Sequence, residues 1–120
     1  MKKGTLFHLA TCSTCQRIIK DLELGSKMNL QDIKTVSITK EQLERMKKLS
    51  GSYESLFSRR AMKFRSMGLH EKKLSEQDYK DLILSEYTFL KRPVALFDEK
   101  VFIGNAKKEV ETLHNYMLTL

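Results

Sequence analysis

The chain contains two residues whose type and spacing could do redox chemistry, Cys12 and Cys15, and they are its only cysteines. They follow a short apolar run at residues 6–9, which predicts a strand, and they begin a stretch of helical spacing that continues to Leu24. Cys12 is therefore expected where a strand ends and a helix begins. The free N–H groups and the helix dipole at that place favour an anion, which here would be a thiolate.

The two thiols are expected to have different roles. The first cysteine of such a motif faces solvent at the helix N-terminus, so Cys12 is predicted to be the nucleophile, and nearby cations would move its pKa from about 8.5 toward 4–7. Cys15 lies one helical turn further on and could resolve a mixed disulfide. Two inert buried thiols are the alternative. A zinc site would need four ligands and only His8 is near, so no metal is predicted.

Composition limits the classes of protein to which the chain can belong. With 120 residues, 41% of them apolar, it can form one domain with a real core, and a C-x-x-C pair closes too small a loop to serve stability. No stretch approaches the roughly 20 apolar residues of a membrane span. The run ending at Cys12 faintly resembles a lipoprotein cleavage site, but it is too short and contains His8. A cytoplasmic location without membrane association is expected.

The net charge of +7 is concentrated in one segment. Residues 40–73 hold ten Lys/Arg against four Asp/Glu, a net of +6. This excess could mark an acidic partner, a nucleic acid or an anionic substrate, or it could be a solvated helical face.

Periodicity and turn residues predict the order of the elements. Strands are expected at residues 5–9, 33–38, 94–97 and 101–103, the last two as an antiparallel hairpin. Helices are expected at 13–24 with Gly25 as the stop, from a Thr39–Gln42 capping box, over 53–67, from Ser75 with Asp78 toward Tyr87, and after an Asn105 cap.

This order, β-α-β, a helical block and then β-β-α, is the thioredoxin arrangement with an insertion. It predicts a single α/β domain with a mixed four-stranded sheet. Residues 1–38 and 88–120 would form the thioredoxin-like core, and residues 39–87 the helical insertion.

Several motifs in this order resemble one known family. They are the cysteine after the first strand, Met67-Gly68-Leu69 followed by Glu71-Lys72, the capped helix from Ser75, and residues 89–94 with the closing hairpin and helix. Over nearly its whole length the chain is similar to the arsenate reductase family of glutaredoxin type (ArsC), which also includes the Spx transcription regulators.

The resemblance implies site residues in the predicted core. His8 matches a histidine that helps to ionise the nucleophile of the family's reductases, although it could equally be a core histidine. Cys15 resembles the Spx pattern, because the reductases usually place a serine there. Arg92 and Pro93 match an Arg-Pro pair of both branches. Pro93 would then be a cis-proline facing the cysteines, the alternative being the start of an edge strand.

The resemblance also implies arginines that would bind an oxyanion or a glutathione carboxylate, since Arg matches such groups bidentately. The arginine of the insertion maps to Arg59 or Arg60, and Arg92 would be a second; all three could instead be surface charges. A third family arginine after the last strand is replaced by residues 103–105, Ile-Gly-Asn, with Lys107 and Lys108 as the nearest cations. This replacement weighs against true arsenate reduction.

Two functions follow from the resemblance. The first is an arsenate-reductase-like thiol oxidoreductase that acts on a small-molecule oxyanion or disulfide, binds no cofactor, and uses glutathione or another thiol as reductant. The alternative is a Spx-like redox-sensing regulator that binds RNA polymerase without sequence-specific contacts to nucleic acid of its own. The enzyme is the favoured interpretation.

Overall fold

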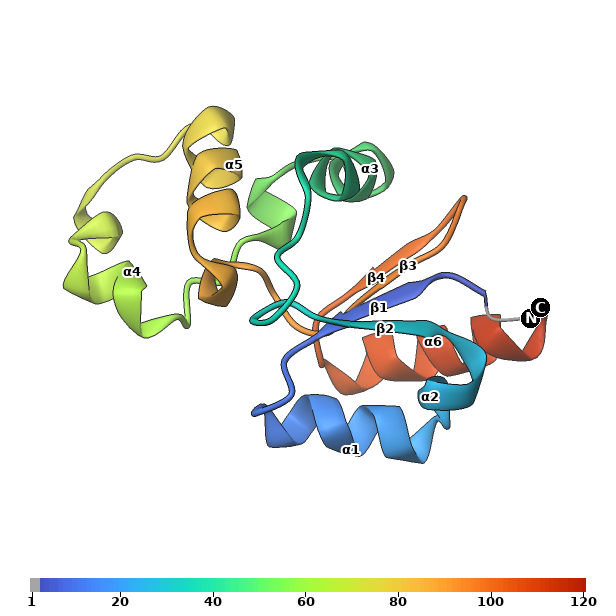
Figure 1. Ribbon diagram of the computed structural model, residues 1–120. Helices are drawn as coiled ribbons and strands as arrows, with labels where there is room; N and C mark the ends of the chain where they lie inside the picture. Colours follow the sequence, from blue (N-terminus) through green and yellow to red (C-terminus); the bar gives the residue numbers. More distant parts are fainter. Residues whose placement is uncertain (1–2) are drawn as a thin grey trace. The chain divides into compact units, whose positions relative to one another are not determined.

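The structure is a computed structural model that describes residues 3–120 and divides into two compact units (Figure 1). We call the first the sheet unit; it comprises the chain up to Val36 together with Arg92–Leu120. The second, Ser37–Lys91, contains helices and turns and is called the helical unit.

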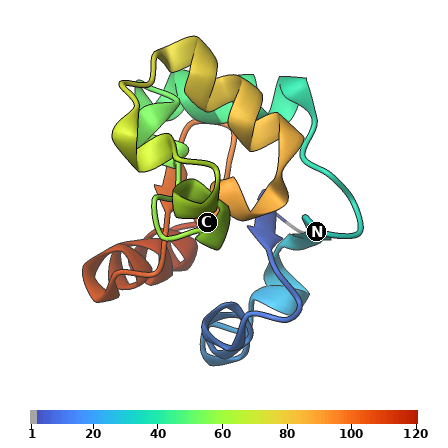
Figure 2. The same ribbon diagram turned by 90° about the vertical axis from the view of Figure 1, so that its left-hand side faces the viewer.

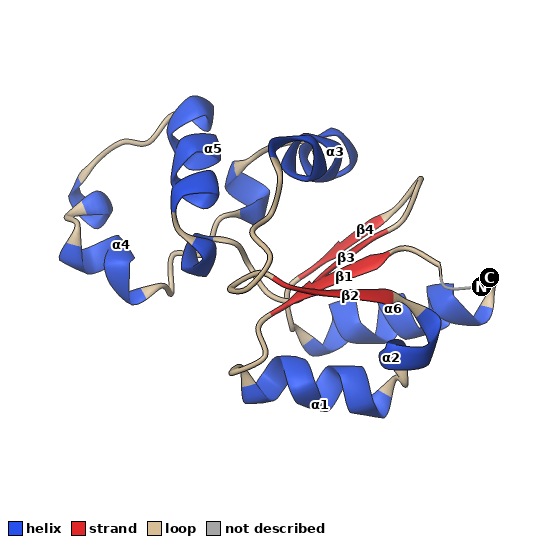
Figure 3. Cartoon of the chain, viewed as in Figure 1, coloured by secondary structure: helices blue, strands red, loops and turns tan. Residues whose placement is uncertain are grey.

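The sheet unit is built on four short strands in the order β2-β1-β3-β4 (Figure 3). The central strand β1 (Thr5–His8) pairs in parallel with β2 (Asn29–Asp32) and antiparallel with β3 (Val94–Leu96). The hairpin partner of β3 is β4 (Val101–Ile103). The predicted mixed four-stranded sheet and its closing hairpin are confirmed.

The core of the sheet unit lies on one face of this sheet. Leu6, Ala95 and Phe102 are register partners on adjacent strands, so their side chains point to the same side. They pack with buried residues of three helices, which Figures 1 and 2 show on a single face of the sheet. These helices are α1 (Ser13–Asp21), α2 (Leu24–Lys27) and α6 (Lys107–Leu118).

Two expectations about α1 and β2 are wrong. Helix α1 ends at Asp21, because the backbone leaves the helical conformation at Leu22 and is left-handed at Glu23, with φ 54°. Gly25 lies inside α2. The strand predicted at residues 33–38 lies earlier, at β2. The Asp32 carboxylate accepts the Lys34 N–H at 3.2 Å, so an aspartate-centred turn overrides the β propensity of the residues that follow.

The predicted capping boxes of the helical unit are both present. Thr39 and Gln42 exchange hydrogen bonds at the start of α3 (Lys40–Ser50), and Ser75 and Asp78 do the same for α5 (Glu76–Ser85). The two exchanges confirm that these helices begin where the sequence predicts.

The single helix predicted over residues 53–67 is wrong. The segment forms the 3₁₀ turn η1 (Glu54–Leu56) and the short helix α4 (Met62–Ser66), separated by extended backbone at Phe57. Phe57 is fully buried, bridges to Leu90 and packs on the rings of neighbouring aromatic residues. Tertiary contacts therefore interrupt the helical pattern. Two further 3₁₀ turns, η2 (Leu69–Glu71) and η3 (Tyr87–Phe89), complete the unit, so α5 does not reach Tyr87.

The start of α6 also differs from the expectation. Ala106 occupies the capping position in place of Asn105 and makes no side-chain cap. The Glu109 carboxylate in the first turn instead accepts the N–H of Ile103 at 2.9 Å, which ties the helix to the end of β4. None of the helices in residues 3–120 combines the length and the hydrophobicity that a membrane-spanning segment needs.

Candidate functional site

Cys12 lies at the N-cap of α1, directly after the turn that leaves β1. Its backbone is extended and its side chain is half-buried, with the backbone N–H held by the Leu9 carbonyl at 3.0 Å. Burial by itself would raise the pKa of the Cys12 thiol. The backbone N–H and thiol of Cys15, the Thr14 N–H and the positive charge of Arg92 outweigh it, and the pKa lies below its ordinary value. The predicted position at a strand-to-helix junction is confirmed.

Cys15 occupies the third position of α1 and is fully buried. Burial, followed by the neighbouring Cys12, raises the pKa of Cys15 to about 11, although the Leu9 N–H and Arg92 act in the opposite direction. The two sulfurs are therefore in contact with each other but in opposite electrostatic environments. One favours the thiolate and the other the neutral thiol.

Arg92 and Pro93 enter the site from the segment before β3. The peptide bond between them is cis, as expected for Pro93, and Pro93 is buried with its carbonyl accepting the Gly104 N–H at 2.8 Å. The charge of Arg92 favours the thiolate form of both cysteines. It helps to lower the pKa of Cys12 and offsets part of the rise in the pKa of Cys15. The structure thus brings together Cys12, Cys15 and Arg92.

His8 lies at the end of β1 and is 8% exposed. Its Nδ1 is 3.4 Å from Nε2 of Gln16 on α1, and the carboxylate of its register partner Asp32 is the charge that acts on it. Burial lowers the pKa of the imidazole, and Asp32 raises it less. The surroundings of His8 are those of a neutral core histidine beside the thiol turn.

Arg59 and Arg60 belong to the helical unit and differ from each other. The Arg59 guanidinium donates to the Glu54 carboxylate at 2.7 Å and to the Tyr79 hydroxyl at 2.9 Å, and lies over the Tyr79 ring. Arg60 is exposed and makes no hydrogen bond or ion pair to another described residue. Of the two, Arg60 has the guanidinium available for an anion.

Two contributors to the site were not identified from the sequence. Thr14 acts through its backbone N–H, which no residue type could signal. Gln16 stands four residues after Cys12 on the same helix, so its side chain lies on the same face as Cys12. The sequence feature that could have identified Gln16 is its amide side chain four residues after Cys12, on a helix that follows a strand ending in His8.

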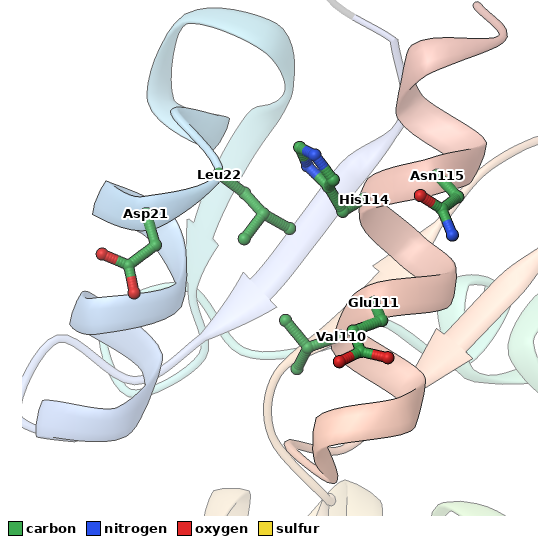
Figure 4. Close-up of a pocket in the computed structure, with 6 residues that line it drawn as sticks. All are labelled: Asp21, Leu22, Val110, Glu111, His114 and Asn115. Carbon is green, nitrogen blue, oxygen red and sulfur yellow. The ribbon is translucent and has the colours of Figure 1, made fainter.

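A pocket of about 430 Å³ lies at the other end of α1, between α1 and α6 (Figure 4). Leu22 and Val110 form its apolar part, and Asp21, Glu111, His114 and Asn115 complete the lining. Helix α1 has nine residues, which places the pocket about 13 Å from Cys12 along the axis. The pocket is thus separate from the thiol site. Among the described residues no group of three or more His, Cys, Asp or Glu could hold a metal ion.

Comparison with known proteins gives consistent results. Residues 7–113 match the model of the ArsC family. The uncharacterized protein YusI of Bacillus subtilis (strain 168) is 31% identical over 111 residues, covering 89% of this chain and 94% of YusI.

Solved structures show the same fold. An arsenate reductase (ArsC) related protein from Brucella melitensis superposes with a TM-score of 0.70 at 24% identity, over 93% of both chains. An arsenate reductase from Vibrio cholerae does so with a TM-score of 0.73 at 14% identity, over 93% of this chain and 98% of that one. These neighbours support the thioredoxin-like fold with its insertion.

Proposed function

The chain belongs to the ArsC family, and on this premise we propose that it is a thiol–disulfide oxidoreductase in which Cys12 is the nucleophile and Cys15 the resolving thiol. The observation that carries the proposal is the asymmetry of the pair. The half-buried Cys12 has a lowered pKa, whereas the buried Cys15 has a pKa raised to about 11.

The reaction follows from this asymmetry. The Cys12 thiolate attacks one sulfur of a substrate disulfide, and the other sulfur leaves as a thiolate that takes up a proton. Cys15 then gives its proton to solvent and attacks the Cys12 sulfur, which releases the second substrate thiol and forms the Cys12–Cys15 disulfide. The substrate has gained two electrons. Two equivalents of a thiol reductant such as glutathione return the pair to the dithiol.

The high pKa of Cys15 keeps this thiol protonated during the first step. A neutral Cys15 donates a hydrogen bond to the Cys12 thiolate while the substrate is attacked. Once Cys12 is part of a mixed disulfide it no longer carries the negative charge that opposes ionisation of Cys15. Attack by Cys15 is therefore favoured only after the first step.

We propose a disulfide rather than arsenate as the preferred substrate. An arsenate ester on Cys12 would place at least two negative charges beside the sulfur. In the sheet unit, Arg92 is the arginine whose positive charge acts at this site and could neutralise them. The place of a further family arginine, after β4, is taken by Gly104 and Asn105, while Lys107 and Lys108 are exposed in the first turn of α6. Each missing charge-assisted hydrogen bond is worth about 1.5–3 kcal/mol, or roughly ten- to a hundredfold in rate.

Parallel turnover assays with a glutathione mixed disulfide and with arsenate test this proposal. We expect measurable disulfide exchange and weak or absent arsenate reduction, with the first activity lost in Cys12→Ser. Vigorous arsenate turnover that collapses in Arg92→Ala would overturn the substrate preference. Absence of both activities would overturn the enzyme proposal.

A second candidate is a redox-switched regulator that binds RNA polymerase, and the helical unit favours it. Helix α4 buries none of its residues, and Met62 is 90% exposed close to Arg60 and Arg65. An apolar side chain among cations fits an acidic protein surface. Polymerase binding that depends on the Cys12–Cys15 oxidation state, in a chain inactive in both assays, would establish this alternative.

A further inference from the structure

The Gln16 side chain connects α1 to the end of β1 through one amide group. Its Nε2 donates to the Leu9 carbonyl at 3.1 Å and also lies 3.4 Å from Nδ1 of His8. A carbonyl oxygen can only accept a hydrogen bond, so the Gln16 atom that faces Leu9 must be the NH₂ group. The orientation of the amide is therefore fixed by its backbone partner.

This orientation determines the state of His8. Because an NH₂ group can only donate, Nδ1 of His8 must accept and its ring proton must sit on Nε2. A proton on Nδ1 would set two donors against each other. The charged group that faces His8 is Asp32 on β2, which favours the imidazolium, but burial outweighs it and the pKa of His8 is lowered.

The same amide supports the thiol turn. The Leu9 carbonyl accepts both the Gln16 amide and the Cys12 N–H, at 3.1 and 3.0 Å, and the Gln16 N–H donates to the Cys12 carbonyl at 3.1 Å. The Leu9 N–H in turn points to the Cys15 sulfur. Gln16 thus closes a ring of hydrogen bonds around the turn that presents both thiols.

We infer that Gln16 is a positioning residue of the thiol site, which fixes the turn between β1 and α1 and holds His8 as the neutral Nε2–H tautomer. The inference rests on the proposed function in so far as Cys12 is the nucleophile. It assigns the stabilisation of the Cys12 thiolate to the N–H groups of α1, the Cys15 thiol and Arg92. His8 then has a structural role instead of that of a cationic partner.

The test compares Gln16→Met and Gln16→Glu with the wild type and with Lys20→Met, a control at an exposed position one turn further along α1. The first readout is the nitrogen chemical shifts of the His8 ring, followed against pH. We expect a single Nε2–H tautomer in the wild type and in Lys20→Met. In Gln16→Met the Nδ1–H form should appear and the pKa of His8 should rise. In Gln16→Glu the pKa should rise further, because a carboxylate accepts from a protonated Nδ1.

The second readout is the alkylation rate of Cys12 above its pKa, where ionisation no longer limits it. Loss of the Leu9 contact should lower this rate about three- to tenfold in both Gln16 variants and leave it unchanged in Lys20→Met. Unchanged His8 nitrogen signals in both Gln16 variants, or equal changes in the control, would overturn the inference. A wild-type Cys12 that fails to exchange with disulfides would contradict the proposed function alone, because the His8 signals test the Gln16 contacts directly.

Discussion

In the sheet unit one reactive group, the Cys12 thiol, is influenced by backbone N–H groups, the neighbouring Cys15 thiol and the charge of Arg92. In the helical unit, by contrast, cationic side chains form ion pairs with carboxylates. In the helical unit Arg59 pairs with Glu54 at 2.7 Å, Lys63 with Glu86 at 2.5 Å and Lys80 with Glu44 at 3.6 Å. The environment of the thiol therefore depends on where β1 ends and α1 begins. The capacity of the helical unit to bind an anion depends on which of its cations are not already paired with a carboxylate.

The largest expected effect concerns the two thiols. Cys12→Ser should lower disulfide exchange at least about a thousandfold, because the nucleophile is lost. Cys15→Ser should still be attacked at Cys12 and should accumulate a mixed disulfide, visible by intact mass. If attack on the substrate disulfide were lost equally in both variants, the two thiols would not have the different roles that their environments in the sheet unit predict.

The elements that could be predicted from sequence are those whose cause is local. The hairpin of β3 and β4, the caps at Thr39 and Ser75, and the cysteine at a strand end all follow from residues within a few positions of each other. Part of the Cys12 environment is also local, because the backbone N–H groups of Thr14 and Cys15 belong to its own helix, whereas Arg92 comes from a distant segment.

The elements that could not be predicted depend on distant partners. Phe57 leaves the helical pattern because it pairs with Leu90, 33 positions later. The Tyr53 and Glu54 N–H groups, at the start of η1, donate to the Glu76 carboxylate at 2.6 and 3.1 Å, a partner more than 20 positions away. The Gln16–His8 contact likewise needs the packing of α1 beside β1. None of these contacts leaves a periodic signal in the sequence.

The next expected effect is on stability and addresses the core of the helical unit. Phe57→Ala should lower the free energy of unfolding by about 3–5 kcal/mol, because a fully buried ring stacked 5.1 Å from Phe89 is removed. Met62→Ala is the matched control, since its side chain is 90% exposed and its loss should cost under about 0.5 kcal/mol. Urea unfolding followed by circular dichroism measures both. Equal effects would show that the aromatic cluster does not hold the unit together.

A smaller effect is expected at the cation of the thiol site. Arg92→Ala should raise the pKa of Cys12 and slow its alkylation at pH 7 about two- to fivefold, because a favourable charge is removed from a half-buried thiolate. The exposed Lys100 in the hairpin turn supplies the control variant, Lys100→Ala. The rate should rise with pH through the pKa of Cys12 and reach its plateau at a lower pH than the rate of an ordinary thiol does. If the alkylation rate of Cys12 depended on pH in the same way in the wild type and in Arg92→Ala, Arg92 would not contribute to the lowered pKa of Cys12.

The two neighbouring arginines of the helical unit should separate stability from activity. Arg59→Ala should cost about 0.2–1 kcal/mol of stability, since a half-exposed ion pair and a ring contact are lost. Arg60→Ala should leave stability unchanged and lower turnover severalfold if this exposed arginine is the anion-binding arginine of the family. The opposite assignment, with turnover lost only in Arg59→Ala, would mean that the Glu54 pair opens to bind substrate.

The smallest effect expected is a pH dependence of stability from His8. Burial lowers the pKa of His8 in the folded chain, so near pH 6.5 the unfolded chain binds more protons at this residue. The contribution of His8 to the free energy of unfolding is therefore fully present above pH 6.5 and is lost as the pH falls from there toward the lower folded-state pKa. Urea unfolding at a series of pH values should show this decline in the wild type and in His114→Gln, which alters an exposed histidine of α6. His8→Gln should flatten it, and a decline of equal slope in His8→Gln would show that another group of the chain is responsible.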